Sequence, residues 1–223
     1  MRLTRRDVTK LASALALDLL APASARGDAP DAEACSPERL DRALADVARA
    51  RANVTTLTGP FTQERTIGLL AAKVRSTGTL TLVRPDRLRW DLAPPDDVVY
   101  WVTPEGLAYR SPTGQGKVPT ASQKIAAALD DLRILLGGDL AALRTRYDLS
   151  GTCHGPDRVT FRATPKAGTP SSFQELRFTL APDLVSPETA TIVEGPRDRT
   201  EIRFGTIRAN VAVAPGVMTP NGP

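Results

Sequence analysis

The feature that most constrains this chain is a run of short segments with a period of two between about residues 57 and 111. Apolar and polar residues alternate in TGTLTLVR, RLRWDL, DVVYWVT and LAYRS, and Pro, Gly or Asp separates these segments. Because side chains alternate across a strand, the pattern is typical of antiparallel strands with one apolar face. Similar segments follow residue 146, so the chain is predicted to form about nine strands or more.

Two regions have helical spacing instead. The segment SPERLDRALADVARARANV begins with Ser36 as an N-cap and Pro37 at the first helical position. Its apolar residues Leu40, Leu44 and Val47 lie on one face. Between residues 119 and 143 the spacing is again helical, and Gly137-Gly138 ends the first helix there. The predicted fold class is therefore α+β, with an antiparallel sheet and helices that cover it.

Two neighbouring strands, joined at RPDRLRW, predict which face the helices cover. One face carries Leu80, Leu82, Arg84, Leu88, Trp90 and Leu92. Arg87 and Arg89 alternate onto the opposite face, where solvent is expected. Two interpretations of Arg84 stay open. Its head group extends to water at the rim of a closed core, or it donates hydrogen bonds to carbonyls at helix ends and holds a lid over a cavity.

The amino terminus predicts export. Residues 1–25 have a basic start, an apolar middle and Ala23 and Ala25 placed as a signal-peptidase site. Arg5 and Arg6 resemble the twin-arginine export pattern, and an ordinary Sec signal stays the alternative. Removing this segment takes away four basic and two acidic residues, so the formal charge falls from +4 to +2 and does not indicate nucleic-acid binding. The expected product is a soluble periplasmic protein with a flexible start at 26–35.

The chain has two cysteines, Cys35 and Cys153. An oxidising compartment allows a disulfide between them but does not require one, since residues so far apart need not meet. Lipidation of Cys35 is disfavoured because Glu33 interrupts the apolar and small residues that should precede a lipidated cysteine.

Several short motifs follow one another in a particular order. They are FTQE at 61–64, GTLTLVRP at 78–85, RLRW at 87–90, a Pro-Asp-Asp turn, LAYRSP at 107–112, FTL at 178–180 and APGV at 214–217. In order and spacing the chain resembles the LolA family of periplasmic carriers of outer-membrane lipoproteins. The resemblance implies an incomplete antiparallel β-barrel, a convex half-barrel, over residues 36–213, with helices as a lid and a tail at 214–223.

The resemblance also implies a site. The apolar interior of this family accepts the acyl chains of a lipoprotein, and the arginine of the Arg-Pro motif, here Arg84, bonds to the lid as a latch. The residues expected to line the acyl-chain cavity are Phe61, Leu80, Leu82, Leu88, Trp90, Leu92, Ile125, Leu129 and Leu132. The chain departs from the family in Leu88, where an aromatic residue is common, and in an aromatic content of 4%.

The partners that the resemblance implies are acylated lipoproteins and an inner-membrane lipoprotein-releasing ABC transporter. Whether an outer-membrane acceptor exists stays open. The carrier is expected to be a monomer that binds no nucleic acid.

No catalytic motif is present, so the chain is not expected to be an enzyme, and no cofactor or metal is predicted. His154 is interpreted as a solvated turn residue, although it adjoins Cys153. Asp130-Asp131 is assigned to a helix surface. The alternatives are a related carrier of another amphiphile, such as a lipid or pigment precursor, a small hydrolase, and an exported β-domain without a ligand.

Overall fold

The computed structural model describes residues 32–70, 72–117, 131, 135–136, 140, 142–156, 158–169, 171 and 173–220. The helices bounded within this part are α1 (Pro37–Arg51) and two short 3-10 helices, η1 (Gly68–Leu70) and η3 (Ala142–Thr145). The strands are β1 (Ala32–Ala34), β2 (Thr56–Ile67), β3 (Ala72–Val83), β4 (Arg87–Leu92), β5 (Val98–Thr103), β6 (Gly106–Ser111), β7 (Gly114–Lys117), β8 (Tyr147–His154), β9 (Arg158–Pro165), β10 (Glu175–Leu180), β11 (Pro187–Val193), β12 (Arg199–Phe204) and β13 (Arg208–Ala209).

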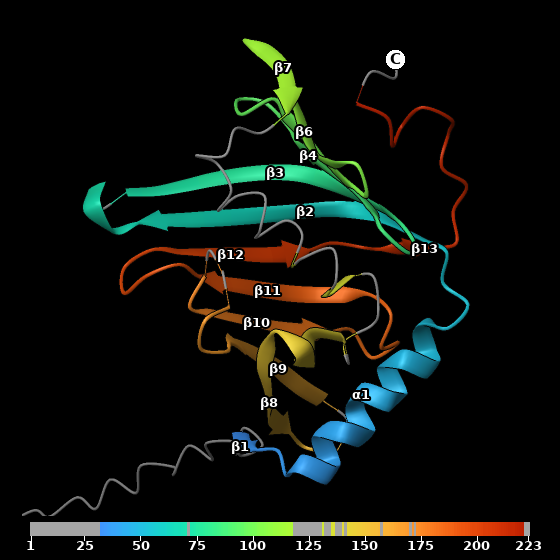
Figure 1. Cartoon of the computed structure of the whole chain (residues 1–223), viewed down its shortest axis with the longest axis vertical. Coiled ribbons are helices and arrows are strands. Elements are labelled where there is room, and N and C mark those ends of the chain that lie inside the picture. Colours follow the sequence, from blue (N-terminus) through green and yellow to red (C-terminus); the bar gives the residue numbers. More distant parts are fainter. Residues whose placement is uncertain are drawn as a thin grey trace, which may run out of the picture.

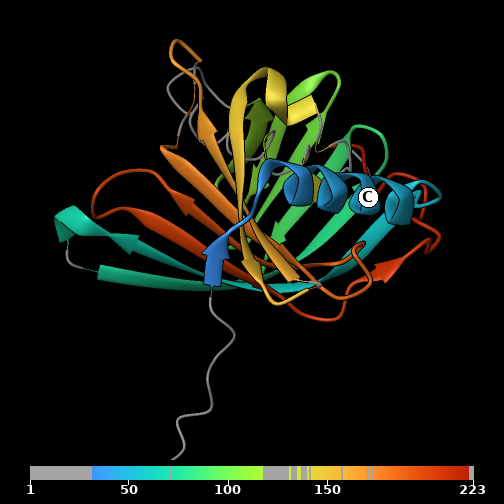
Figure 2. The ribbon, with the colours of Figure 1, turned by 90° about the horizontal axis from the view of Figure 1, so that it is seen from below.

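All thirteen strands belong to one antiparallel sheet (Figure 1). The order is β1-β8-β9-β10-β11-β12-β2-β3-β4-β5-β6-β7, and β13 pairs with β2. Within the described residues the path ends at β1 and β7, so the sheet does not close on itself. Figure 2 shows the sheet curving, with α1 across one of its faces, which we call the inner face. The predicted antiparallel sheet is confirmed, and an open, curved sheet is consistent with an incomplete barrel.

The predicted helical lid is not supported. Most of residues 119–143 lies outside the described part of the chain, and so do Ile125, Leu129 and Leu132. Within the described part, α1 is the one α-helix whose bounds are established, and no helix there is long and apolar enough to cross a membrane.

The helix α1 forms for local reasons that the sequence shows. The Ser36 side chain accepts a hydrogen bond from the Arg39 backbone N–H at 3.3 Å, and Pro37 fills the first helical position. Leu40, Leu44 and Val47 are buried, as their spacing predicted. Because this stripe packs on the inner face, α1 and the sheet share one apolar core.

The strand pairing confirms the predicted faces. Leu80 on β3 lies opposite Trp90 on β4, and Leu82 lies opposite Leu88. All four side chains are buried in the core. A sheet whose inner residues alternate with outer ones in this way presents a continuous apolar surface to α1.

Gly78 on β3 lets an aromatic ring approach the backbone. A Cβ atom there would lie 2.5 Å from the Phe61 ring and 2.1 Å from the Asp91 carbonyl oxygen. Phe61, on β2, lies opposite Gly78 and stacks on Trp90 with ring centroids 3.9 Å apart. The missing side chain therefore makes room for the aromatic pair at the centre of the inner face.

Gly78→Ala is expected to lower the free energy of unfolding by about 1–3 kcal/mol, because the added methyl group forces the Phe61 ring or the β4 backbone to move. Urea denaturation followed by tryptophan fluorescence measures the change. Gly116→Ala is the matched control, since a Cβ atom at Gly116 has no neighbour within 4 Å. Equal stability of the Gly78→Ala and Gly116→Ala variants would contradict the packing argument.

Part of the outer face of the sheet, at β4 and β5, is also covered, which the sequence did not predict. Trp101 on β5 is 1% exposed, and its Nε1 donates a hydrogen bond to the Val217 carbonyl oxygen at 2.9 Å. Arg89 donates to the same oxygen at 3.3 Å, and its guanidinium lies 5.5 Å from the centroid of the Trp101 ring. The expectation that Arg89 points to solvent is therefore wrong, because the chain around Val217 packs over this face.

Candidate functional site

The candidate site is the apolar cluster on the inner face. Phe61, Leu80, Leu82, Leu88 and Trp90 are each at most 3% exposed, whereas Leu92 is half-buried beside them. Phe204 on β12 meets the Trp90 ring edge-on, with centroids 6.3 Å apart. The sheet thus brings together six of the nine residues predicted to line an acyl-chain cavity, and the other three lie outside the described residues.

The cover over this cluster comes from α1 and from the segment between β7 and β8. Four described leucines of that segment belong to the same core cluster and are at most 3% exposed: Leu135, Leu136, Leu140 and Leu143. None of these four leucines was predicted from the sequence. In this state the inner face is filled by the chain's own apolar side chains.

Arg84, at the end of β3, holds the carboxyl-terminal end of α1. Its Nη1 donates to the Arg51 carbonyl oxygen and, at 3.1 Å, to the Val54 carbonyl oxygen. Its backbone N–H donates to the Thr55 carbonyl oxygen at 2.9 Å. The last carbonyls of a helix lack partners within the helix, so a guanidinium placed here stabilises both the helix end and its contact with the sheet.

Arg51 makes the contact with the covering segment, and sequence reasoning missed it. This side chain is only 2% exposed, and its Nη1 donates to the Leu135 carbonyl oxygen at 2.7 Å. Its Nη2 donates to the Val185 carbonyl oxygen at 3.0 Å, in the loop between β10 and β11. Arg51 therefore joins three parts of the chain: α1, the segment around Leu135 and the loop at Val185.

Burial, and secondly the neighbouring positive charge of Arg84, lower the pKa of Arg51 to about 10. Arg51 therefore stays charged at neutral pH, and both the carbonyl dipoles and the negative charge of Asp183 compensate it. A signal for this role exists in the sequence. Arg51 continues the spacing of Leu40, Leu44 and Val47, so a cation falls on the buried stripe of an amphipathic helix.

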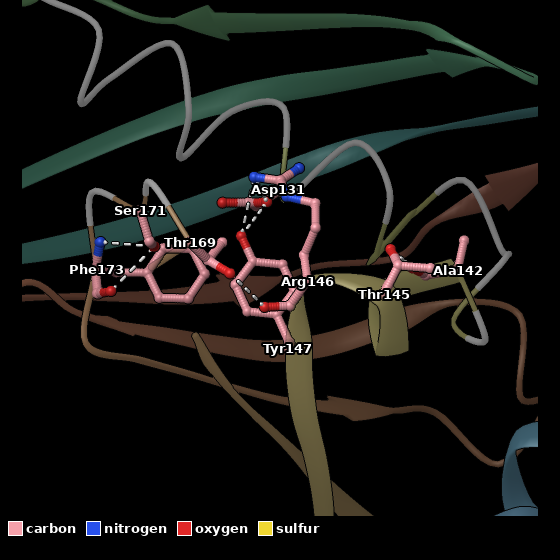
Figure 3. A network of polar contacts seen from close by, with 8 residues as sticks. All are labelled: Asp131, Ala142, Thr145, Arg146, Tyr147, Thr169, Ser171 and Phe173. Atoms are coloured by element: carbon pink, nitrogen blue, oxygen red, sulfur yellow. Dashed lines mark hydrogen bonds and ion pairs between the residues drawn. The ribbon is translucent and has the colours of Figure 1, made fainter. Parts of the chain in front are cut away.

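A polar network also anchors the covering segment (Figure 3). Asp131 is fully buried, accepts a hydrogen bond from the Tyr147 hydroxyl, and lies 3.2 Å from an Arg146 guanidinium nitrogen. Tyr147 stacks on Phe173 at a centroid distance of 5.5 Å. Burial and the bond to Asp131 raise the pKa of the Tyr147 hydroxyl above its ordinary value. The assignment of Asp131 to a solvated helix surface is therefore wrong, since Tyr147 and Arg146 supply partners inside the fold.

The two cysteines form a disulfide across 118 residues. Cys35 precedes α1, and Cys153 lies on β8 with 1% of its surface exposed. The Cys35 backbone N–H also donates to the Gly151 carbonyl oxygen at 2.9 Å. The disulfide fixes the start of α1 to the sheet, and Arg84 fixes its end.

The remaining polar candidates do not form a reactive centre. His154 is the last residue of β8, and its Nε2 lies 2.9 Å from the Thr160 hydroxyl on β9, so it is a strand residue rather than a turn residue. In the described part of the chain, no group of three or more His, Cys, Asp or Glu residues is placed to hold a metal ion. The arrangement around the inner face is suited to enclosing apolar groups.

Comparison with known proteins gives one family match. The model of the outer membrane lipoprotein carrier protein LolA matches residues 52–220. No curated protein matches the chain at a significant level.

Matches among solved structures include three proteins of low sequence identity. A LolA superfamily protein from Nitrosomonas europaea is 8% identical, with a TM-score of 0.43 and coverage of 78% of this chain and 94% of that one. A putative outer membrane lipoprotein-sorting protein domain from Vibrio parahaemolyticus is 9% identical, with a TM-score of 0.47 and coverage of 81% and 97%. The Mycobacterium tuberculosis lipoprotein LppX is 14% identical, with a TM-score of 0.44 and coverage of 80% and 99%.

Proposed function

Because this chain belongs to the LolA family of outer membrane lipoprotein carrier proteins, we propose that it is a periplasmic carrier that encloses the acyl chains of lipoproteins against its inner face. The proposed lining consists of the nine residues that the resemblance predicted, with Leu135, Leu136 and Leu140 as the groups that acyl chains displace. The protein binds and releases its cargo without chemistry on it.

The observation that supports this proposal most directly is how the apolar cover is attached. Arg84 donates hydrogen bonds that hold the end of α1 to the sheet, and Arg51 donates hydrogen bonds that join α1 to Leu135 and to the β10–β11 loop at Val185. Each such bond contributes roughly 0.5–2 kcal/mol net, with the more buried bonds at the upper end. A carrier has to take up acyl chains and give them back, so part of the binding energy must be offset by opening a closed state. Opening a cover that is held by a few hydrogen bonds over an apolar face costs a few kcal/mol, which can offset part of the binding energy of the acyl chains.

The compartment and the partners belong to the same proposal. We assign residues 1–25 to an export signal, with the mature chain beginning near Arg26. Lipoprotein cargo then comes from a lipoprotein-releasing ABC transporter in the inner membrane and is carried to the outer membrane. The disulfide between Cys35 and Cys153 supports an oxidising compartment, where such bonds persist.

The test is native mass spectrometry of the protein purified from the periplasmic fraction of its own source. The expected result is a mature chain that lacks about 25 residues and carries an acylated protein. A free lipid in its place would favour the carrier of another amphiphile. A ligand-free protein that also fails to bind an acylated peptide in solution would contradict the carrier function.

Arg84→Leu sharpens this test. This variant loses the bonds to the Arg51 and Val54 carbonyls, which is expected to favour the open state by about 1–4 kcal/mol. It should therefore take up cargo at least as well as the wild-type protein but release the cargo more slowly. Transfer of a fluorescent acylated peptide to acceptor vesicles measures the release rate. Arg87→Leu is the control because Arg87 pairs with Glu105 at the surface. Arg89 cannot serve, since it bonds to Val217. Equal transfer rates for both variants and wild type would leave Arg84 without a role in closure.

A further inference from the structure

A cavity separate from the proposed acyl-chain site lies between α1 and the β9–β11 part of the sheet, with a volume of about 640 Å³. Ligand pockets in proteins span roughly 300–1,000 Å³. Its apolar wall is formed by Val47 on α1, Phe161 on β9, Leu180 on β10 and Leu184 in the loop that follows. None of its lining residues is among the nine proposed for the acyl-chain cavity. Binding of a ligand in this cavity is therefore independent of the proposed carrier function.

The rim of this cavity is charged. It carries Arg39, Arg42 and Asp46 from α1, Arg158 from β9 and Glu188 from β11. Both carboxylates already have partners: Glu188 pairs with Arg158 at 2.7 Å, and Asp46 pairs with Arg49, which lies outside the cavity. Arg39 donates to the Gly155 carbonyl oxygen, and Arg42 has no hydrogen bond or ion pair with any described residue. Among the described residues, neither Arg39 nor Arg42 forms an ion pair, although the pKa of Glu38, one helical turn away, is lowered by hydrogen bonds to its own backbone N–H and to Ser36 and in part by the charge of Arg42.

From this combination we propose that the cavity binds an anionic single-chain amphiphile, with the chain against Phe161 and Leu180 and the acidic head group at Arg39 and Arg42. Guanidinium groups bind carboxylates and phosphates through paired N–H donors. A fatty acid carries a carboxylate head group and a lysophospholipid carries a phosphate head group, so either could occupy the rim. A neutral amphiphile of the same length would bury the same chain but leave the two cations unmatched. Charge, rather than chain length, is thus the feature that selects the ligand.

The test uses the fluorescent fatty acid cis-parinaric acid and its uncharged methyl ester with the full mature protein. The acid is expected to bind at least tenfold more tightly than the ester at low ionic strength, and the difference should shrink as salt screens the rim. Arg42→Gln should reduce the affinity for the acid about tenfold and leave the ester unchanged. Arg87→Gln is the matched control, because Arg87 pairs with Glu105 and neither residue lines the cavity.

Ala43→Trp tests the location, because Ala43 lines the cavity and a tryptophan there would fill it. Binding of the acid should be lost, with Ala43→Leu as a smaller filling variant if the first does not fold. Competition separates the two ligand sources: displacement by lysophosphatidylglycerol assigns a phosphate head group, and displacement by oleate alone assigns a carboxylate. Equal affinity for acid and ester, or binding of the acid that survives both substitutions of Ala43, would overturn the proposal.

Discussion

Arg51→Met is expected to loosen the contact between α1 and the segment around Leu135 by about 2–4 kcal/mol, which corresponds to a population change of roughly 30- to 1,000-fold. The loss comes from the two hydrogen bonds to the Leu135 and Val185 carbonyls, at 2.7 and 3.0 Å. Methionine occupies similar apolar space, so the packing of α1 should persist. It also removes a buried charge whose Nε has no acceptor among the described residues. Local opening should therefore change more than global stability.

Hydrogen exchange of the peptides that contain Leu135 and Leu136 measures this local opening directly. Exchange there should accelerate in Arg51→Met, while exchange in β2 and β3 stays slow. If the cover closes the acyl-chain cavity, affinity for an acylated peptide should rise at least tenfold, because less binding energy is spent on opening. Arg49→Met is the control, since Arg49 lies two residues away and is exposed. Unaltered exchange around Leu135 would show that packing alone holds the cover.

The second large effect concerns the disulfide. Replacing Cys35 and Cys153 together by alanine is expected to lower the free energy of unfolding by about 4–5 kcal/mol, because the bond closes a loop of more than 100 residues. The sequence separation is 118. Loss of the bond also loosens the start of α1 from β8, where the backbone hydrogen bond of Cys35 to Gly151 and the hydrogen bond of Arg39 to Gly155 then hold it.

Urea denaturation of the oxidised protein with and without reductant measures this contribution. The reduced wild type should unfold at the same urea concentration as the double alanine variant, and reductant should not affect that variant. A difference below about 1 kcal/mol between the oxidised wild type and the double variant would mean that other contacts already restrict the unfolded chain.

The parts of the fold that were predictable depend on neighbours in sequence. Ser36 and Pro37 define the start of α1 within one turn, and alternation in β3 and β4 places Leu80, Leu82, Leu88 and Trp90 on one face. Both signals depend only on nearby residues, so they predict the local structure without information on the rest of the chain.

What was not predictable depends on residues that are far apart. The partners of Arg51 lie 84 and 134 residues away, at Leu135 and Val185. Alternation placed Arg89 on the outer face correctly, but nothing near it in sequence shows that Val217 covers that face. Asp131 was assigned to solvent because its partner Tyr147 belongs to another element. In each case the environment of a polar side chain is set by tertiary contacts that periodicity does not encode.

The strand order has a consequence for how this protein is made. Residues 56–117 and 147–204 form two halves of the sheet that meet where β2 pairs with β12. Of the strands in these two halves the ribosome makes β2 first and β12 last, so the edge of β2 that pairs with β12 stays unpaired until residues 199–204 emerge. An unpaired strand next to an apolar surface invites association with other chains, and pairing over so long a separation is slow. Under the proposed export, a chain that crosses the membrane unfolded exposes β2 to other chains unless a partner shields it, whereas a chain exported after folding has already paired β2 with β12.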